Sequence, residues 1–151
     1  MTGARRVLCV GATLGLLAIP APALAQQSEL RVDVLGPAPY SVQPGVGAIV
    51  PLGYYVRVSA DVGYAPRSSA NLVSDHWRAD LLTRVTLDPF RQQRWGFSIG
   101  GGLSVRRHAY LAAIADLEGP EMHGLLPALQ VGLSGGLRAA VIVRRAVKGR
   151  R

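Results

Sequence analysis

Apolar residues occupy every second position in three stretches of the chain, residues 54–64, 77–87 and 95–105. In the first stretch the even-numbered positions carry Tyr, Val or Ala, whereas the odd-numbered positions include Arg57 and Asp61. Successive side chains of an extended strand point to opposite faces of its sheet. This two-residue period therefore predicts β-strands with one apolar face and one polar face.

Five further segments show the same alternation, and turn-forming residues separate them. Pro44 falls within one of them, where a proline weakens a strand or marks its start. Another, residues 110–117, is rich in alanine, so a short helix is the alternative there. The chain is expected to form one all-β domain, an antiparallel up-and-down β-barrel of about eight strands. The five additional segments are residues 30–34, 42–50, 110–117, 127–134 and 137–143.

The first 25 residues have the layout of a secretory signal peptide. Arg5 and Arg6 precede an apolar core at residues 7–19, and Ala-Leu-Ala at residues 23–25 offers a cleavage site. An uncleaved membrane anchor is the alternative. The only cysteine, Cys9, lies in this segment, so the exported protein would contain no disulfide. The predicted organisation is a signal peptide at residues 1–25, the barrel at 26–147 and a basic tail at 148–151.

The formal net charge is +8, and much of the excess lies at the end of the chain. The remainder of the exported chain is nearly neutral, so the high pI describes a terminus more than a surface. A basic terminus can contact anionic lipid or an anionic polymer of the cell envelope, or can simply be solvated. We expect no nucleic-acid partner for an exported protein. The basic residues of this terminus are Arg144, Arg145, Lys148, Arg150 and Arg151.

The apolar face of the predicted barrel can point inward, as in a soluble barrel, or outward toward lipid. Tyr54 and Tyr64 lie ten residues apart on one face, which spans about 25 Å along the membrane normal for a tilted strand. Trp77 and Trp95 also flank strands, and these four aromatics are predicted to lie at the membrane interfaces. The polar face carries charges of both signs, which favours an interior network. Its predicted members are Arg31, Asp33, Arg57, Asp61, Arg78, Asp80, Arg84 and Arg138.

With its strand pattern and signal peptide, the chain resembles the small eight-stranded outer-membrane β-barrel family, typified by the membrane domain of outer-membrane protein A. The resemblance covers nearly all of residues 30–143 and rests on no short diagnostic motif. It implies that both termini face the periplasm. It also implies that the outer loops are residues 36–41, 65–76, 106–108 and 134–136.

Catalytic chemistry is not evident, and no catalytic, cofactor or metal site is predicted. His76, His108 and His123 fall on different predicted loops without metal-ligand spacing. Ser74, Asp75 and His76 are neighbours in sequence, which does not produce a triad. A lipid-active enzyme that depends on His76 is a minor hypothesis.

We therefore expect an outer-membrane barrel with a structural or weakly pore-forming role, outer-membrane lipid as its partner and no enzymatic activity. The alternative is a soluble barrel, periplasmic or secreted, that binds a small hydrophobic ligand. In that alternative Val56, Leu81 and Phe97 would line the interior.

Overall fold

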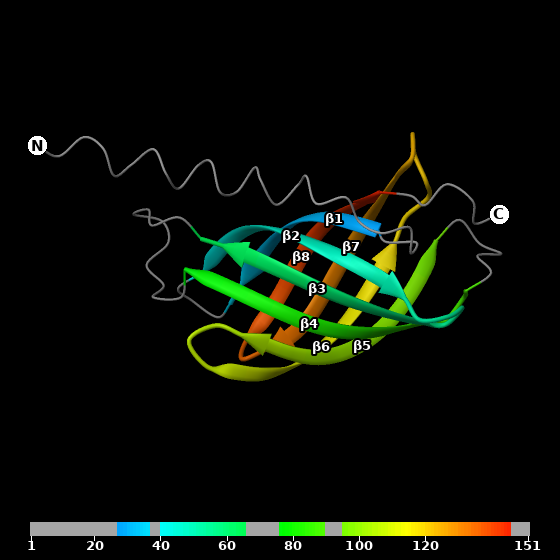
Figure 1. Cartoon of the computed structure of the whole chain (residues 1–151). Helices are drawn as coiled ribbons and strands as arrows, with labels where there is room; N and C mark the ends of the chain where they lie inside the picture. Colours follow the sequence, from blue (N-terminus) through cyan, green and yellow to red (C-terminus); the bar gives the residue numbers. More distant parts are fainter. Residues whose placement is uncertain (1–26, 37–39, 66–75, 90–94, 146–151) are drawn as a thin grey trace, which may run out of the picture.

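The computed structural model describes residues 27–36, 40–65, 76–89 and 95–145, which form a closed barrel of eight antiparallel strands (Figure 1). Each strand pairs with the next along the chain, and β1 closes the ring against β8, from Glu29 opposite Arg144 to Leu35 opposite Arg138. The predicted all-β up-and-down barrel is confirmed. The strands are β1 (Gln27–Leu35), β2 (Ser41–Pro51), β3 (Val56–Tyr64), β4 (Trp77–Thr86), β5 (Gly96–Val105), β6 (Ala109–Glu118), β7 (Leu125–Ser134) and β8 (Leu137–Arg145).

The up-and-down order places alternate turns at opposite ends of the barrel. We call the end that holds the start of β1 and the end of β8 the proximal end. The opposite end, which holds the turns after β1, β3, β5 and β7, is the distal end. Among the described residues, no helix has the length and the apolar character needed to cross a membrane.

The alanine-rich segment 110–117 is a strand and not a helix. It lies within β6, which pairs with β5 along its whole length and with β7 from Ala112 to Glu118. Pairing on both sides outweighs the helical preference of alanine, which is a weak local term. Pro44 lies inside β2 and not at its start, at a position opposite Val32, and the pairing of β2 with β3 begins one residue later. A proline is tolerated at this position because Pro44 has a pairing partner in β1 but none in β3.

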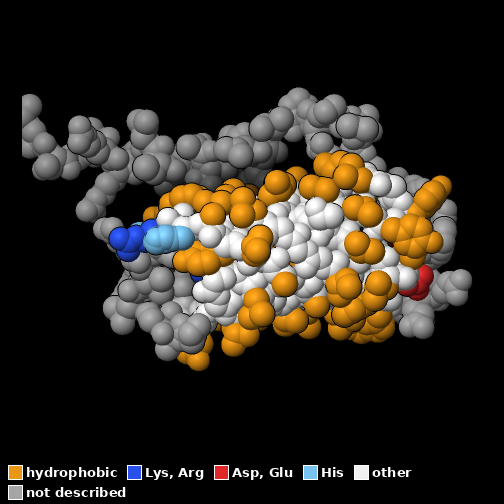
Figure 2. Space-filling model, turned by 90° about the horizontal axis from the view of Figure 1, so that it is seen from below, with side chains coloured by type: hydrophobic (Ala, Val, Ile, Leu, Met, Phe, Trp, Pro, Cys, Tyr) orange, Lys and Arg blue, Asp and Glu red, His pale blue; other side chains and the backbone are white. Residues whose placement is uncertain are grey.

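The polar face of every strand points into the barrel, and the apolar face points outward. Side chains such as Leu81, Leu129 and Val141 are more than half exposed on the wall. Figure 2 shows apolar side chains over the visible wall, with charged side chains only toward its two ends. Among the outward-facing residues of the described strands, Arg145 alone is charged. The barrel is therefore inverted relative to a soluble protein with an apolar core.

Glycines allow adjacent strands to approach closely at one side of the barrel. A Cβ atom at Gly100 would lie 2.1 Å from the carbonyl oxygen of Thr83, and one at Gly102 would lie 2.0 Å from that of Leu81. Neither position can accept a side chain without movement of β4. The glycine run at residues 100–102 therefore permits a close approach of the backbones of β4 and β5.

The interior contains some apolar packing as well. Leu82, Ala112 and Ile114 form one small buried cluster. A second cluster joins β7 to β8. The rest of the buried interior is mostly polar or charged.

Candidate functional site

The barrel interior holds a dense set of charged side chains, and it is the candidate functional site. Five buried arginines and six buried carboxylates project from β1, β3, β4, β6 and β8. Arg57 on β3 adds a sixth guanidinium, whose side chain is 13% exposed. The described interior therefore carries equal numbers of positive and negative groups. The buried members are Glu29, Arg31, Asp33, Asp61, Arg78, Asp80, Arg84, Asp116, Glu118, Arg138 and Arg144.

The distal half of this network is centred on Asp33. Its carboxylate accepts hydrogen bonds from Arg78 Nη2 at 2.7 Å and from Arg138 Nε at 2.8 Å. Arg78 Nε also lies 3.0 Å from Asp80 Oδ2. Arg138 on β8 reaches Asp80 on β4, the strand four places away in the ring of eight, so this ion pair spans the lumen. Asp61 lies 3.4 Å from both Arg78 and Arg138.

The proximal half is centred on Arg144. Its guanidinium donates to Glu29 Oε2 and to Asp116 Oδ2, each at 3.1 Å, and also to Glu118. Arg57 Nη1 donates to Glu118 Oε1 at 2.8 Å. Arg84 Nε lies 3.2 Å from Asp116 Oδ2. These contacts connect β1, β3, β4, β6 and β8 across the barrel.

Arg31 joins the two halves. Its Nη1 lies 3.0 Å from Glu29 Oε1 in the proximal half and 2.8 Å from Asp61 Oδ2 in the distal half, and its Nε donates to Asp33 at 2.8 Å. It also donates to Gln130 Oε1, while Gln130 Nε2 donates to Asp116 at 2.8 Å. With Arg31 counted in the distal half, each half contains three arginines and three carboxylates.

Cross-barrel pairing compensates for like charges that neighbour one another in the wall. Asp61 lies opposite Asp80 and Arg57 lies opposite Arg84 in the pairing of β3 with β4. Like charges directly opposite destabilise a strand pair. Here Arg138 contacts both aspartates. Burial of so many charges is tolerable only because each has a partner of opposite sign.

The distal half of the network, together with Glu29, is sealed from solvent. The side chains of Glu29, Arg31, Asp33, Asp61, Arg78, Asp80 and Arg138 all have 0% of their surface accessible to water. A solute pathway along the axis would expose the groups that line it. The arrangement can hold the strands in register, but it leaves no solvent-accessible surface on these groups.

The structure places all eight predicted network residues on the inward face of the barrel, and six of them contact one another directly. The other two, Arg57 and Arg84, pair with carboxylates outside the predicted set, Arg57 with Glu118 and Arg84 with Glu29 and Asp116. Four members were missed. Glu29 precedes the predicted strand 30–34, and Glu118 follows the predicted segment 110–117. Asp116 lies in the segment with the helical alternative. Each nevertheless follows the two-residue period of its strand, which is the signal that could have identified it.

Arg144 was assigned to the basic terminus, and this prediction is wrong. It is fully buried in the network, because it keeps the inward phase of Arg138, Ala140 and Ile142 along β8. Arg145 is exposed at the end of the strand. Residues 146–151, including the tail at 148–151, lie outside the described residues, as do residues 1–26.

The four predicted interface aromatics lie on the outside of the barrel at its ends, each more than half exposed. Tyr64 lies opposite Trp77 at the distal end. Tyr54 and Trp95 are proximal. Every aromatic residue in the described part of the chain lies within two positions of a strand end, four at each end. The remaining four are Tyr40 and Tyr110 at the distal end, and Tyr55 and Phe97 at the proximal end.

The histidines do not form a site together. His76 and His108 flank strands at the distal end, and His123 lies in the proximal turn between β6 and β7. Within the described ranges, no three His, Cys, Asp or Glu residues are grouped so that they could hold a metal ion. Ser74 and Asp75 lie outside the described residues.

Comparison with known proteins gave no relative: no family model, curated protein or solved structure matches the chain.

The apolar interior expected for a soluble ligand-binding barrel is not observed. Leu81 and Phe97, which would line it, are 57% and 43% exposed on the outer wall. Val56 has the same outward phase along β3.

Proposed function

We propose that this protein is an integral outer-membrane β-barrel with a structural role and a sealed interior. The observation that carries the proposal is the inversion of the barrel, with its charges inside and an apolar wall outside. Monomeric soluble proteins rarely expose contiguous apolar patches larger than a few hundred Å². Here every described strand contributes exposed apolar side chains to the wall.

The dimensions of the wall and its aromatic residues support the same proposal. Strands of 9 to 11 residues, tilted by about 40°, span roughly 25 Å, the height of the apolar band of outer-membrane barrels. Aromatic side chains bound that band at both interfaces in such proteins. Tyr64 and Trp77 at the distal end, and Tyr54 and Trp95 at the proximal end, occupy the corresponding positions in this barrel. Tyr110 differs, because it has the inward phase of β6.

The sealed interior favours a structural role over a pore. The charged side chains of the distal half, together with Glu29, have no accessible surface, and ion pairs such as Arg138–Asp80 cross the lumen. Liposomes that contain the protein should therefore swell in sugar solutions no faster than empty liposomes. Swelling at the rate of a porin would contradict the sealed interior.

A pair of single-cysteine variants tests the membrane assignment, in a Cys9→Ser background. Val141 is 58% exposed in the middle of β8, whereas its neighbour Ala140 points inward and is 4% exposed. In membranes, Val141→Cys should react with a lipid-soluble maleimide and resist a charged, water-soluble one. Ala140→Cys should resist both until the protein is unfolded.

The alternative makes a different prediction for the same variants. If the protein remains in the soluble fraction without detergent and Val141→Cys reacts with the charged reagent, the wall faces water. The membrane proposal then fails, and a soluble barrel takes its place. Contact of the basic terminus with an anionic envelope polymer stays a prediction.

A further inference from the structure

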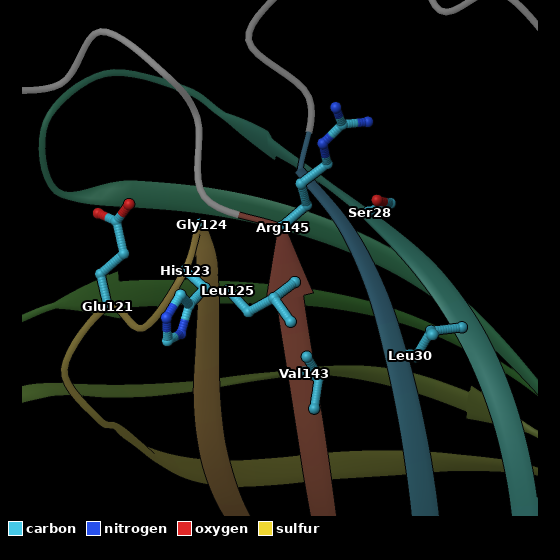
Figure 3. Close-up of a pocket in the computed structure, with 8 residues that line it drawn as sticks. All are labelled: Ser28, Leu30, Glu121, His123, Gly124, Leu125, Val143 and Arg145. Carbon is cyan, nitrogen blue, oxygen red and sulfur yellow. The ribbon is translucent and has the colours of Figure 1, made fainter.

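A groove lies outside the barrel at the proximal end, where β1 meets β8 (Figure 3). Its volume is about 600 Å³. Leu30 of β1, Leu125 of β7 and Val143 of β8 form an apolar floor. The rim is polar and includes Glu121, His123 and Arg145.

Two opposite charges lie on either side of this groove. Figure 3 shows Glu121 on one side and Arg145 on the other, with His123 and Leu125 between them. Arg145 is the one charged residue on the outward face of the described strands, and it stands at the end of its strand. Glu121 and Arg145 are both exposed, and no ion pair joins them among the contacts of the described residues. The two charges therefore do not neutralise each other.

A tight turn fixes the position of His123. Met122 and Leu125 exchange two backbone hydrogen bonds of 2.9 Å, and Gly124 adopts a φ of 77°. His123 itself has a φ of 53°, which is uncommon for a residue with a side chain. This backbone holds the imidazole beside Leu125, at the boundary between the polar rim and the apolar floor (Figure 3).

The apolar floor continues into a second hollow of about 730 Å³ on the wall. The two hollows share Leu30 and Val143, and the second is lined further by Val32 and Val141 and reaches the distal aromatics Tyr64 and Trp77. A mixed-charge rim at one end and a long apolar surface beyond it match the two parts of a phospholipid molecule.

We propose that this groove binds a zwitterionic phospholipid, whose headgroup carries a phosphate and an ammonium group. The phosphate contacts Arg145, the ammonium group contacts Glu121, and one acyl chain lies over Leu30 and Val143. An anionic lipid satisfies Arg145 equally but leaves Glu121 facing a lipid without a positive charge. The inference rests on the proposed function, because only in a membrane would the proximal end of the wall meet headgroups.

The test measures the lipid that the full chain retains. The detergent-solubilised protein is incubated with equal amounts of phosphatidylethanolamine and phosphatidylglycerol of the same acyl composition, and the bound lipid is identified by native mass spectrometry. Wild-type protein should retain more phosphatidylethanolamine. Glu121→Gln should lower that preference by about two- to fivefold, the effect of one exposed ion pair. Arg145→Gln should lower retention of both lipids by a similar factor.

Two matched variants serve as controls. Arg107→Gln removes an exposed arginine from the distal turn, and Asp88→Asn removes a carboxylate from the connection after β4. Neither lines the groove. If Glu121→Gln and Arg145→Gln retain lipid as these controls do, or if wild-type protein shows no preference, the inference is wrong.

Two further outcomes separate the possible explanations. If soluble phosphoethanolamine competes as well as the whole lipid does, the apolar floor has no role and the phospholipid proposal fails. If the protein fractionates as soluble, the proposed membrane function fails first. If it inserts but the groove variants behave like the controls, only the lipid site fails.

Discussion

Replacement of Asp33 by asparagine removes one negative charge from the centre of the distal half of the network. The carboxylate is fully buried and lies within 2.9 Å of nitrogen atoms of Arg31, Arg78 and Arg138. Asparagine has nearly the same shape and keeps one acceptor oxygen. The change therefore tests charge compensation with little change in packing.

The size of the effect follows from the contacts that remain. Removal of one partner from a buried ion pair costs about 3–5 kcal/mol, since the other charge stays buried. Here Arg31 retains Glu29 and Asp61, and Arg78 and Arg138 both retain Asp80. We therefore expect Asp33→Asn to lower the free energy of unfolding by about 3 kcal/mol, at the lower end of that range.

Equilibrium unfolding by urea, with the protein folded in lipid vesicles, measures this difference. Arg107→Gln is the control, and an exposed substitution of this kind should change the free energy of unfolding by less than about 0.5 kcal/mol. The double variant Asp33→Asn/Arg138→Gln restores equal numbers of charges in the interior. It should be less destabilised than the sum of its two single variants, with a coupling energy of about 0.5–3 kcal/mol. A loss below about 1 kcal/mol for Asp33→Asn, together with additive effects in the double variant, would refute the reasoning.

Two other predictions concern the wall. Val141→Arg, in the middle of β8, should destabilise the membrane-inserted barrel by about 2–4 kcal/mol, whereas Leu137→Arg at the strand end should cost at most about 1 kcal/mol. Unfolding of the protein from lipid vesicles measures both values. Equal and small effects of the two variants would contradict a lipid-facing wall. Gly102→Ala places a Cβ 2.0 Å from the Leu81 carbonyl oxygen. The fraction of this variant that refolds should therefore fall well below the fraction of the control variant Ala113→Val, which changes the outward face of β6. Normal refolding of Gly102→Ala would show that β4 can move.

The strands and the division of their side chains into an apolar face and a polar face could be predicted because a two-residue period is a local property of the sequence. Arg57 and Asp61 share the inward phase of β3 wherever the rest of the chain lies. Pairing partners are not local in this sense. Arg138 meets Asp80 because the ring closes between β1 and β8 with one particular register, and no feature near either residue specifies that contact.

The residues that were missed lie where the period meets a competing local feature. Arg144 is the next inward position after Ile142, but it opens a run of basic residues, so it was interpreted as part of a solvated tail. Asp116 and Glu118 follow the inward phase of Ala112 and Ile114, but alanine-rich sequence and the turn after Glu118 obscured it. In both cases the phase of the strand was the better guide, since it is set by the whole strand and not by one residue.

The ionic interior and the apolar wall together support a lipid environment more strongly than either does alone. Buried ion pairs contribute little net free energy, because desolvation offsets much of the attraction between the charges. The interior network therefore does not replace the apolar core that stabilises a soluble barrel of this size. The closed ring pairs β1 with β8 and leaves no unpaired strand edge, which is the condition for a sheet in hydrocarbon. Under the proposed function, lipid covers the apolar wall of this closed and internally charge-compensated barrel. In water the same wall would be an exposed apolar surface, which favours aggregation.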